Sequence, residues 1–545
     1  MGVFMKRILI LSLLPIILYS CGGGASLEKA DESYDLKQFS VAADMYEGLY
    51  SKQKTEIEKA VVAYKAGESF RHMNEYRKAE SWYSRAIDKG YSDPDIHWNY
   101  AEVLKQQKKF DEAKEQYKLY KDKTGDPRAD KGLKSLELYD EWQSYESRYV
   151  VEENDRLSSG LSNEYAPAYY KDKEALYFSS DREGGLNNKD YSWTGYSFLD
   201  IWMSEWDERK ERWNTPTLIE AEFLTEYNDG VISFNDRMSV MYYTQCNGNE
   251  GEEYNCRIMM SKRRGRKWGE GEVLEFCTDS SVNYGHPSIS KNDKKLFFTA
   301  NMDDSEGDFD LYVVYHVGRG NNWSEPQNLG PVINTSGKDM YPYIFENNTL
   351  YFASDGHPGL GGMDLFESTW DGEKWSEPKN LKPPMNSSGD DFSIGMYRDR
   401  KTKNIEGHFA SNRSDNPGKT DDNLFSFNLL PLEFTLSGTV YWVEKNEAVA
   451  NAEVTLNIIE EESGEPLTVP TNEEGKYFYE LEPEKDYTVK GNKEGFFASQ
   501  VKEVSTVGYE LSENFIRDLY IKKIPPSEIK LEGIYYGLDS FNLRK

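Results

Sequence analysis

Between residues 341 and 381 the sequence reads Tyr341-Pro342-Tyr343-Ile344, Leu350-Tyr351-Phe352-Ala353-Ser354-Asp355, Gly361-Gly362-Met363-Asp364-Leu365-Phe366, Trp375-Ser376-Glu377-Pro378 and Asn380-Leu381. Short apolar and aromatic runs separated by Gly, Asp, Asn and Pro are typical of short strands joined by turns. An earlier copy contains Gly285-His286-Pro287-Ser288, Leu296-Phe297-Phe298-Thr299-Ala300, Asp308-Phe309-Asp310-Leu311-Tyr312, Trp323-Ser324-Glu325-Pro326 and Asn328-Leu329. Because several spaced features recur together, the two copies indicate one repeated unit that reads as four strands.

Three further copies begin near Ala166-Pro167, Asp229-Gly230 and Asp391-Phe392, which makes five units, roughly 50 to 65 residues apart. Radial repetition of four-stranded sheets is a β-propeller, so residues 145–430 are predicted to form one with about five blades. We expect the leading segment Tyr145 to Leu157 to complete one blade by pairing with the last. The repeated motif resembles the WD-like propeller of the TolB type, which is found in many periplasmic proteins.

Few groups in the propeller region favour catalysis. No Gly-x-Ser-x-Gly motif is present, and no Ser/His/Asp set stands out in a chain with 6 histidines. Asp181, Asp355 and Asp364 recur at turns, where we expect them to accept hydrogen bonds from backbone amides. The acidic stretch 302–310 lacks the residue order of a calcium-binding loop. We therefore predict that the chain is not an enzyme and binds neither a metal ion nor a cofactor.

The N-terminus carries a targeting signal. Lys6-Arg7 precede an apolar run from Ile8 to Leu18 that is too short to span a bilayer of about 30 Å. Leu18-Tyr19-Ser20-Cys21 has an aliphatic residue at −3 and a small one at −1, and resembles a bacterial lipobox. The resemblance implies that residues 1–20 are a signal peptide and that Cys21 is lipidated, with 21–26 as a flexible tether. No Asp follows Cys21, so we expect the body to hang from the outer membrane on its periplasmic face.

Residues 27–144 are predicted to be helical, because Gly and Pro are sparse and apolar residues recur at helical spacing. Within them a pattern repeats with a shift of 34 residues: Gly67, Tyr76, Ala79 and Tyr83 recur as Ala101, Phe110, Ala113 and Tyr117. This period and its small and aromatic positions resemble the tetratricopeptide repeat. The resemblance implies a solenoid with a groove for a peptide or protein partner, although a spacer role is the alternative.

Two more segments follow the propeller region. Residues 431–524 contain alternating strands and a hairpin at Thr471 to Phe478, and resemble the carboxypeptidase regulatory-like domain, a transthyretin-type sandwich. Residues 525–545 contain a linker and then Leu531 to Arg544, which look like the first strand of an OmpA-type domain. The chain stops at Lys545, before the segment with which that family holds peptidoglycan. We therefore expect peptidoglycan binding only through a C-terminal domain that is missing from this sequence.

Net charge limits the possible partners, and the cysteine content limits the possible disulfides. A formal net charge of −30 repels phosphate backbones, which excludes nucleic acid as a partner. Cys246 and Cys256 flank the polar stretch 247–255, which reads as a hairpin loop, so a disulfide there is plausible and would leave Cys277 free. The sequence alone leaves the pairing open.

The predicted fold is multidomain, helical at the N-terminus and all-β afterwards, with the beginning of an OmpA-like α/β domain. This order of segments resembles the PorE-type lipoproteins of the OmpA family in Bacteroidetes, which are associated with type IX secretion. The resemblance implies an outer-membrane scaffold that docks secretion proteins through the helical groove and the propeller and, in a full-length form, tethers them to peptidoglycan. Two alternatives remain. A glycan-binding or glycan-processing propeller lipoprotein would show a funnel of acids and aromatics at the propeller mouth, whereas a general envelope tether would have no secretion role.

Overall fold

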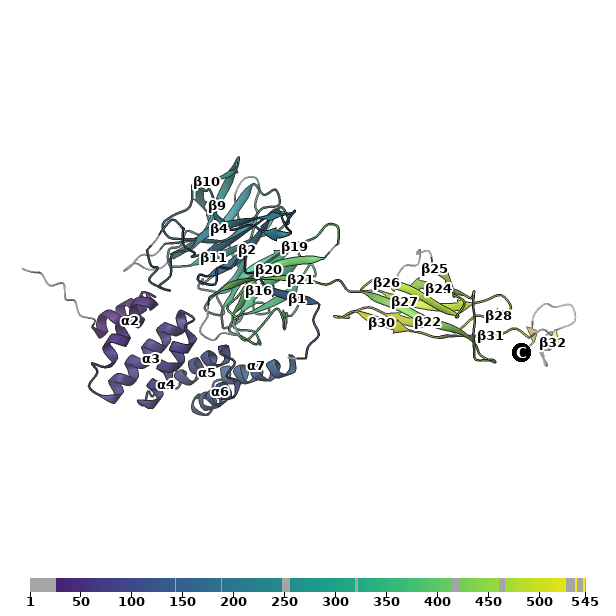
Figure 1. Cartoon of the computed structure of the whole chain (residues 1–545), viewed down its shortest axis with the longest axis horizontal. Helices are drawn as coiled ribbons and strands as arrows, with labels where there is room; N and C mark the ends of the chain where they lie inside the picture. Colours follow the sequence, from purple (N-terminus) through teal and green to yellow (C-terminus); the bar gives the residue numbers. More distant parts are fainter. Residues whose placement is uncertain are drawn as a thin grey trace, which may run out of the picture. The chain divides into compact units, whose positions relative to one another are not determined.

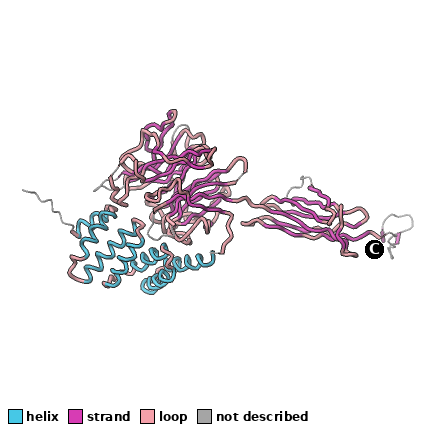
Figure 2. Tube along the Cα trace, viewed as in Figure 1, coloured by secondary structure: helices cyan, strands magenta, loops and turns pink. Residues whose placement is uncertain are grey.

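The computed structural model describes residues 26–142, 144–187, 189–247, 255–318, 322–402, 404–413, 421–459, 466–525, 535–536 and 543–544. These residues form two compact units. One contains the residues up to Tyr145, Val151–Arg398 and Glu406–Phe427, and the other contains Glu146–Val150, Asp399–Ile405 and the residues from Asn428 onwards. Helices are confined to the N-terminal part of the first unit, and everything after them is strand and loop (Figures 1 and 2). The chain is therefore a multidomain α plus β protein, as the sequence predicts.

Consecutive helices pack against one another along the N-terminal segment (Figure 1). Their bounds are α1 (Leu27–Asp35), α2 (Phe39–Tyr50), α3 (Glu56–His72), α4 (Tyr76–Asp88), α5 (Asp95–Gln106), α6 (Phe110–Thr124) and α7 (Arg128–Trp142). The turns after α1, α3 and α5 contain Lys37, Asn74 and Lys108, each with φ 59°, a left-handed conformation that ends a helix. A Cβ on Gly132 would lie 2.4 Å from the Tyr117 ring, so small residues allow the aromatic packing between helices.

The strands from β1 to β21 form five sheets among the described residues, and each sheet has a path of four hydrogen-bonded strands. The sheets follow the orders β2-β3-β4-β5, β10-β9-β8-β7, β11-β12-β13-β14, β15-β16-β17-β18 and β1-β21-β20-β19, and β6 also pairs with β4. The innermost strands β2, β7, β11, β15 and β19 contact one another in that order, and β19 contacts β2. Sheets arranged in a closed ring form a five-bladed propeller.

The blade bounds follow chain order. They are β1 (Tyr149–Glu153), β2 (Glu164–Tyr170), β3 (Ala175–Ser180), β4 (Asp200–Asp207), β5 (Arg212–Trp213), β6 (Thr217–Leu218), β7 (Asn228–Phe234), β8 (Val240–Asn247), β9 (Asn255–Arg264), β10 (Lys267–Val273), β11 (Tyr284–Ile289), β12 (Lys295–Ala300), β13 (Asp310–Tyr315), β14 (Gln327–Asn328), β15 (Asp339–Phe345), β16 (Thr349–Ser354), β17 (Asp364–Thr369), β18 (Lys379–Asn380), β19 (Asp391–Arg398), β20 (Ile405–Ser411) and β21 (Asn423–Leu429). Strand β1 pairs with β21, so the expected completion of the last blade by the leading segment is confirmed.

The second unit is a sandwich of two sheets. Its strands are β22 (Phe434–Trp442), β23 (Glu447–Ala448), β24 (Glu453–Ile458), β25 (Leu467–Pro470), β26 (Lys476–Leu481), β27 (Asp486–Asn492), β28 (Phe496–Phe497), β29 (Lys502–Ser505), β30 (Glu513–Ile516) and β31 (Leu519–Lys523). One sheet is built around β22 and the other follows β25-β24-β27-β29. Alternate side chains such as Leu436, Val454 and Val489 are fully buried between them. This alternation is typical of strands with one face on the core.

Several sequence predictions fall outside the described residues. The signal peptide and Cys21 lie in 1–25, and most of the OmpA-like stretch lies in 526–534 and 537–542. The described part of that stretch is a pair of short strands, β32 (Tyr535–Tyr536) and β33 (Leu543–Arg544). In the part of the chain that is described, no helix is both long enough and apolar enough to cross a membrane.

Two glycines in the helices should respond to alanine in opposite directions. Gly132→Ala places a methyl group against the Tyr117 ring, so we expect it to lower the free energy of unfolding by about 1–3 kcal/mol. Gly48 lies in α2 with nothing within 4 Å of an added Cβ, so Gly48→Ala should raise the free energy of unfolding by up to about 1 kcal/mol. Urea denaturation followed by circular dichroism at the helical band measures both. If the two variants shift in the same direction, the packing at Gly132 is misassigned.

Candidate functional site

Four aromatic rings from four inner strands meet near the propeller axis, and we call Tyr165, His286, Tyr341 and Phe392 the axial aromatic cluster. The His286 and Tyr341 rings stack with centroids 3.9 Å apart, and Tyr341 lies 5.0 Å from Phe392. Tyr165 lies 5.8 Å from Phe392 and 6.3 Å from Tyr341. Tyr165 is on β2 and Tyr341 is on β15, which are not neighbours in the ring of inner strands. Their contact therefore places the cluster at the axis.

A bulge at the same place in each inner strand shapes this region. Five residues, one per inner strand, have φ between 45° and 56°: Ala166, Val231, His286, Tyr341 and Ser393. The pairing register with the neighbouring strand shifts at this position in β2, β7, β11 and β15. Positive φ is uncommon outside glycine, and bulges change the direction of a side chain. Backbone strain that recurs in every blade is a pointer to function.

The cluster is asymmetric, because the inner strand β7 lacks an aromatic residue at this place. The equivalent place on β7 holds Gly230 and Val231, so this blade contributes no ring. A Cβ on Gly230 would lie 2.5 Å from Ser179 Oγ of the preceding blade, which explains the glycine. Tyr165, His286 and Tyr341 are only half-buried, whereas Phe392 is 7% exposed. Burial lowers the pKa of His286 to about 3, so this ring is neutral and the cluster carries no cation.

Acidic groups lie next to the cluster. The carboxylates of Asp422 and Asp390 contribute, after burial, to raising the pKa of Tyr341 above its ordinary value. Burial, followed by the nearby Asp390 and Asp181, raises the pKa of Asp422 well above its usual range. Asp422 Oδ1 has no hydrogen-bond partner among the described residues. Burial and the neighbouring acids therefore favour the protonated form of Asp422, and strongly shifted pKa values of this kind recur at binding and catalytic sites.

Asn163 links Asp422 to a second carboxyl group. The backbone N–H of Asp422 donates to Asn163 Oδ1 at 3.1 Å, and Asn163 Nδ2 donates to Asp181 Oδ2 at 2.6 Å. Burial raises the pKa of Asp181 to about 6. Burial thus raises the pKa of two neighbouring carboxyl groups, Asp181 and Asp422, although the sequence position of Asp181 predicts only a turn role.

Asp390 belongs to the joint between the helices and the propeller. Its Oδ2 accepts a hydrogen bond from Tyr76 Oη at 2.8 Å, and its Oδ1 accepts from Gln106 Nε2 at 3.0 Å. Met363 N and Asn412 Nδ2 donate to the same carboxylate. Elsewhere in this joint Lys131 Nζ donates to the carbonyl of Asp355. The helices α4 and α5 therefore reach the same group of loops as the acids beside the cluster.

The expected turn roles of three aspartates are confirmed. Asp181 accepts from the N–H of Asn163 at 2.8 Å, Asp355 from that of Lys338 at 2.7 Å, and Asp364 from that of Gly361 at 3.3 Å. No group of three or more His, Cys, Asp or Glu side chains is arranged to hold a metal ion within the described ranges. No sequence motif marks the cluster, because its members come from different blades and meet only when the ring closes.

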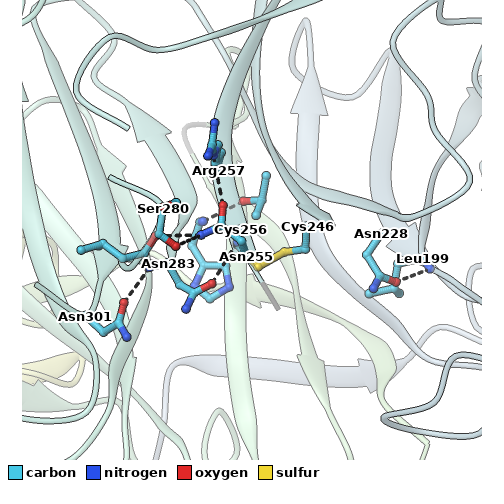
Figure 3. The surroundings of a disulfide bond; sticks show 12 residues. Leu199, Asn228, Cys246, Asn255, Cys256, Arg257, Ser280, Asn283 and Asn301 are labelled. Carbon is cyan, nitrogen blue, oxygen red and sulfur yellow. Dashed lines mark hydrogen bonds between the residues drawn. A yellow bond between two sulfur atoms is a disulfide. The ribbon is translucent and has the colours of Figure 1, made fainter. Parts of the chain in front are cut away.

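A disulfide joins Cys246 and Cys256 on the neighbouring strands β8 and β9 (Figure 3). The backbone N–H of Cys256 donates to Asn283 Oδ1 at 2.9 Å, and Asn283 N donates to Asn301 Oδ1 at 2.7 Å. The bridge therefore lies where one blade is hydrogen-bonded to the next. Cys277 is a free, buried thiol, and burial raises its pKa to about 12, which makes it unreactive.

Comparison with known proteins gives structural likeness only. No family and no curated protein matches the chain. An α-L-arabinofuranosidase from Lactobacillus brevis matches at 9% identity with a TM-score of 0.35, covering 50% of this chain and 93% of that one. An exo-β-1,3-galactanase from Clostridium thermocellum matches at 8% identity with a TM-score of 0.35, covering 66% and 87%. A mutant Trypanosoma rangeli sialidase matches at 9% identity with a TM-score of 0.30, covering 64% of this chain and 85% of that one.

These structures contradict the prediction that the chain is not an enzyme, because the similar structures are enzymes. That prediction was wrong in treating missing sequence motifs as evidence against catalysis. Propeller sites are built from residues on separate blades, and one fold supports many functions. At these identities and TM-scores the likeness assigns no activity to this chain.

Buried carboxyl groups in the propeller predict a pH dependence of stability. Burial raises the pKa of Asp181, Asp200, Asp229 and Asp339 to about 6, whereas an unfolded Asp titrates near 3.9. Between these values the folded state binds more protons than the unfolded state, so stability falls as pH rises from about 4 to about 6. We expect a higher melting temperature at pH 5 than at pH 7.5, measured by differential scanning calorimetry.

Self-repulsion of the net charge of −30 would also make the protein less stable at higher pH. Salt screens exposed charges more than buried ones, so the difference should persist in 0.5 M NaCl, about the range where the Debye length is a few ångströms. A propeller transition that shifts to lower temperature at pH 5 would show that these carboxyl groups are ionised in the folded protein.

Proposed function

We propose that the axial aromatic cluster and Asp422 form a carbohydrate-binding site. Convergence of aromatic rings from four blades beside the buried carboxyl group of Asp422, whose pKa burial raises, is the observation that supports this proposal. Aromatic rings offer flat apolar faces to the C–H side of a sugar, and carboxyl groups hydrogen-bond to its hydroxyls. Binding sites commonly combine such an apolar lining with a few placed polar groups.

The local charge selects among carbohydrates. Asp390 and Asp422 lie near Tyr341 of the cluster, His286 is neutral, and the whole chain carries a net charge of −30. An anionic sugar would be repelled by this field. We therefore propose a neutral or amino-sugar glycan as the ligand. Asp422 would donate a hydrogen bond from its protonated carboxyl group, and the same proton makes it the candidate acid if the glycan is also processed.

Removing the Tyr341 ring from the axial aromatic cluster should weaken the binding of an oligosaccharide. We expect Tyr341→Ala to reduce affinity roughly tenfold, or about 1.4 kcal/mol, because His286 and Phe392 both pack against this ring. Tyr341→Phe keeps the ring and should retain most of the affinity. The measurement is calorimetric titration of the full chain with hexasaccharides of cellulose, xylan, mannan and chitin, with release of shorter sugars recorded in parallel.

Tyr315→Ala is a matched control, because Tyr315 is 37% exposed at the end of β13. It should bind as the unaltered chain does. If no oligosaccharide in the panel binds, or if Tyr341→Ala and Tyr315→Ala behave alike, the axial cluster is not a carbohydrate site.

A second proposal concerns location and partners. The lipobox at Leu18-Tyr19-Ser20-Cys21 supports anchoring in the outer membrane on the periplasmic face. The hydrogen bonds from Tyr76 and Gln106 to Asp390 tie the helices to the propeller, which suits a docking scaffold. Under this proposal the chain holds protein partners of an envelope complex, such as the secretion machinery and the cell wall that the family resemblance implies.

Cys21→Ser tests the anchor. Without the thiol no diacylglyceryl group can be attached, so the variant should move from the membrane fraction to the soluble fraction, while the unaltered chain is labelled by palmitate. Fractionation followed by immunoblotting measures the shift. Cys277→Ser is the control, because this buried thiol is unreactive and should leave fractionation unchanged. A Cys21→Ser protein that stays in the membrane fraction would rule out the lipid anchor.

A further inference from the structure

An open pocket of about 590 Å³ lies on the helical segment, away from the axial aromatic cluster. Its walls come from α4, α5 and the first residues that lead into α6. The lining residues are Arg77, Glu80, Ser81, Ser84, Arg85, Tyr100, Gln107 and Lys109. Hydroxyl and amide groups thus alternate with cations over the pocket wall.

The pocket is cationic in a strongly acidic chain. It contains three cations and one carboxylate, although Asp and Glu outnumber Lys and Arg by 95 to 65 in the sequence. Lys109 Nζ lies 2.6 Å from both carboxylate oxygens of Glu80, so this pair is neutral as a whole. Arg77 and Arg85 form no ion pair with any described residue. The pocket therefore presents two guanidinium groups that have no ion-pair partner among the described residues.

Helix α4 explains how these groups come to share one wall. Arg77, Ser81, Ser84 and Arg85 recur at helical spacing on the exposed face, while Ala79, Trp82, Tyr83 and Ala86 are buried on the other. The Arg85 guanidinium lies 4.4 Å from the centre of the Trp82 ring, which restricts its position. The helical core thus supports one of the two arginines.

The spacing of the arginines defines a ligand pattern. Eight residues of helix separate Arg77 from Arg85, which corresponds to about 12 Å. Residues i and i+4 of an extended peptide point to the same side and lie about 13 Å apart. Two carboxylates with this spacing would each reach one arginine. Guanidinium groups bind carboxylates through paired N–H donors, which adds geometric selectivity to the charge.

Tyr100 supplies a neutral hydrogen-bond donor. Its pKa is raised to about 12, first by burial and then by Glu80, Glu112 and Asp88. Asp88 and Glu112 therefore lie close enough to oppose an anion, which weakens binding of a small free ion that can use only one arginine. A ligand with two linked carboxylates gains from both arginines and overcomes this repulsion.

We propose that this pocket binds an extended acidic segment of a partner protein, with two carboxylate side chains four residues apart that pair with Arg77 and Arg85. The inference deepens the docking role proposed above and rests on it for biological context. It requires neither the carbohydrate site nor the lipid anchor. The two proposals can fail separately, because Cys21→Ser fractionation does not depend on the pocket.

Fluorescence anisotropy on the full-length protein in mild detergent tests the pocket. The probe is a labelled Gly/Ser peptide with glutamates at i and i+4, compared with the same peptide carrying glutamines. We expect saturable binding of the glutamate peptide, weakened roughly tenfold by Arg77→Gln combined with Arg85→Gln. Lys52→Gln combined with Lys118→Gln makes the same charge change at exposed positions and should leave binding unchanged.

Three results with the peptides and variants would overturn the proposal, and a fourth comes from competition with phosphate. They are no binding of the glutamate peptide, equal binding of the glutamine peptide, and equal loss in the arginine and lysine variants. Inorganic phosphate provides the small-anion comparison. If phosphate displaces the peptide fully at equal concentration, the pocket is a general anion site and not a peptide site. Both arginines are exposed, and an unchanged far-ultraviolet circular dichroism spectrum confirms that their substitution leaves the fold intact.

Discussion

The propeller depends on hydrogen bonds at the bulges of its inner strands, which the structure shows at β2, β7 and β11. A residue with positive φ turns its N–H out of its own ladder, and a hydroxyl group of the preceding blade accepts it. Ala166 N donates to Ser393 Oγ, and His286 N donates to Thr244 Oγ1. Val231 N donates to Ser179 Oγ in the same manner. A buried N–H left without a partner costs about 1–3 kcal/mol, so these bonds fix three of the blades against the blades that precede them.

The axial aromatic cluster depends on these bonds. His286 and Tyr341 occupy the bulge position itself, and Phe392 directly precedes it on β19. Only a rotated backbone brings rings from strands that are not neighbours within 6.3 Å. The joint with the helices lies in the adjacent loops, where Asp390, next to Asp391 and Phe392, accepts from Tyr76 and Gln106. The bulges, the aromatic cluster and the joint with the helices therefore lie next to one another, on the inner strands and in the loops that adjoin them.

Periodicity predicted much of this fold, because repeats leave the same spaced residues in every copy. The five units, the pairing of the segment near Tyr149 with the last blade, and the helices up to Trp142 all follow from local patterns. The candidate sites do not. Tyr165 and Phe392 meet only after ring closure, and Asp422 comes close to Asp390 and Asp181 only in the folded chain. The absence of sequence motifs also misled the prediction about catalysis, because propeller sites are assembled from distant blades.

The pairing of β1 with β21 also has a consequence for the order in which the protein matures. Ser426 Oγ donates to the carbonyl of Glu152 across a sequence separation of 274 residues. At a synthesis rate of about 5–20 residues per second, β1 waits on the order of tens of seconds before β21 emerges. During that time it is an unpaired edge, which is a template for aggregation. Glu152 and Glu153 place adjacent negative charges on this strand, so the waiting edge repels other copies of itself until the ring can close.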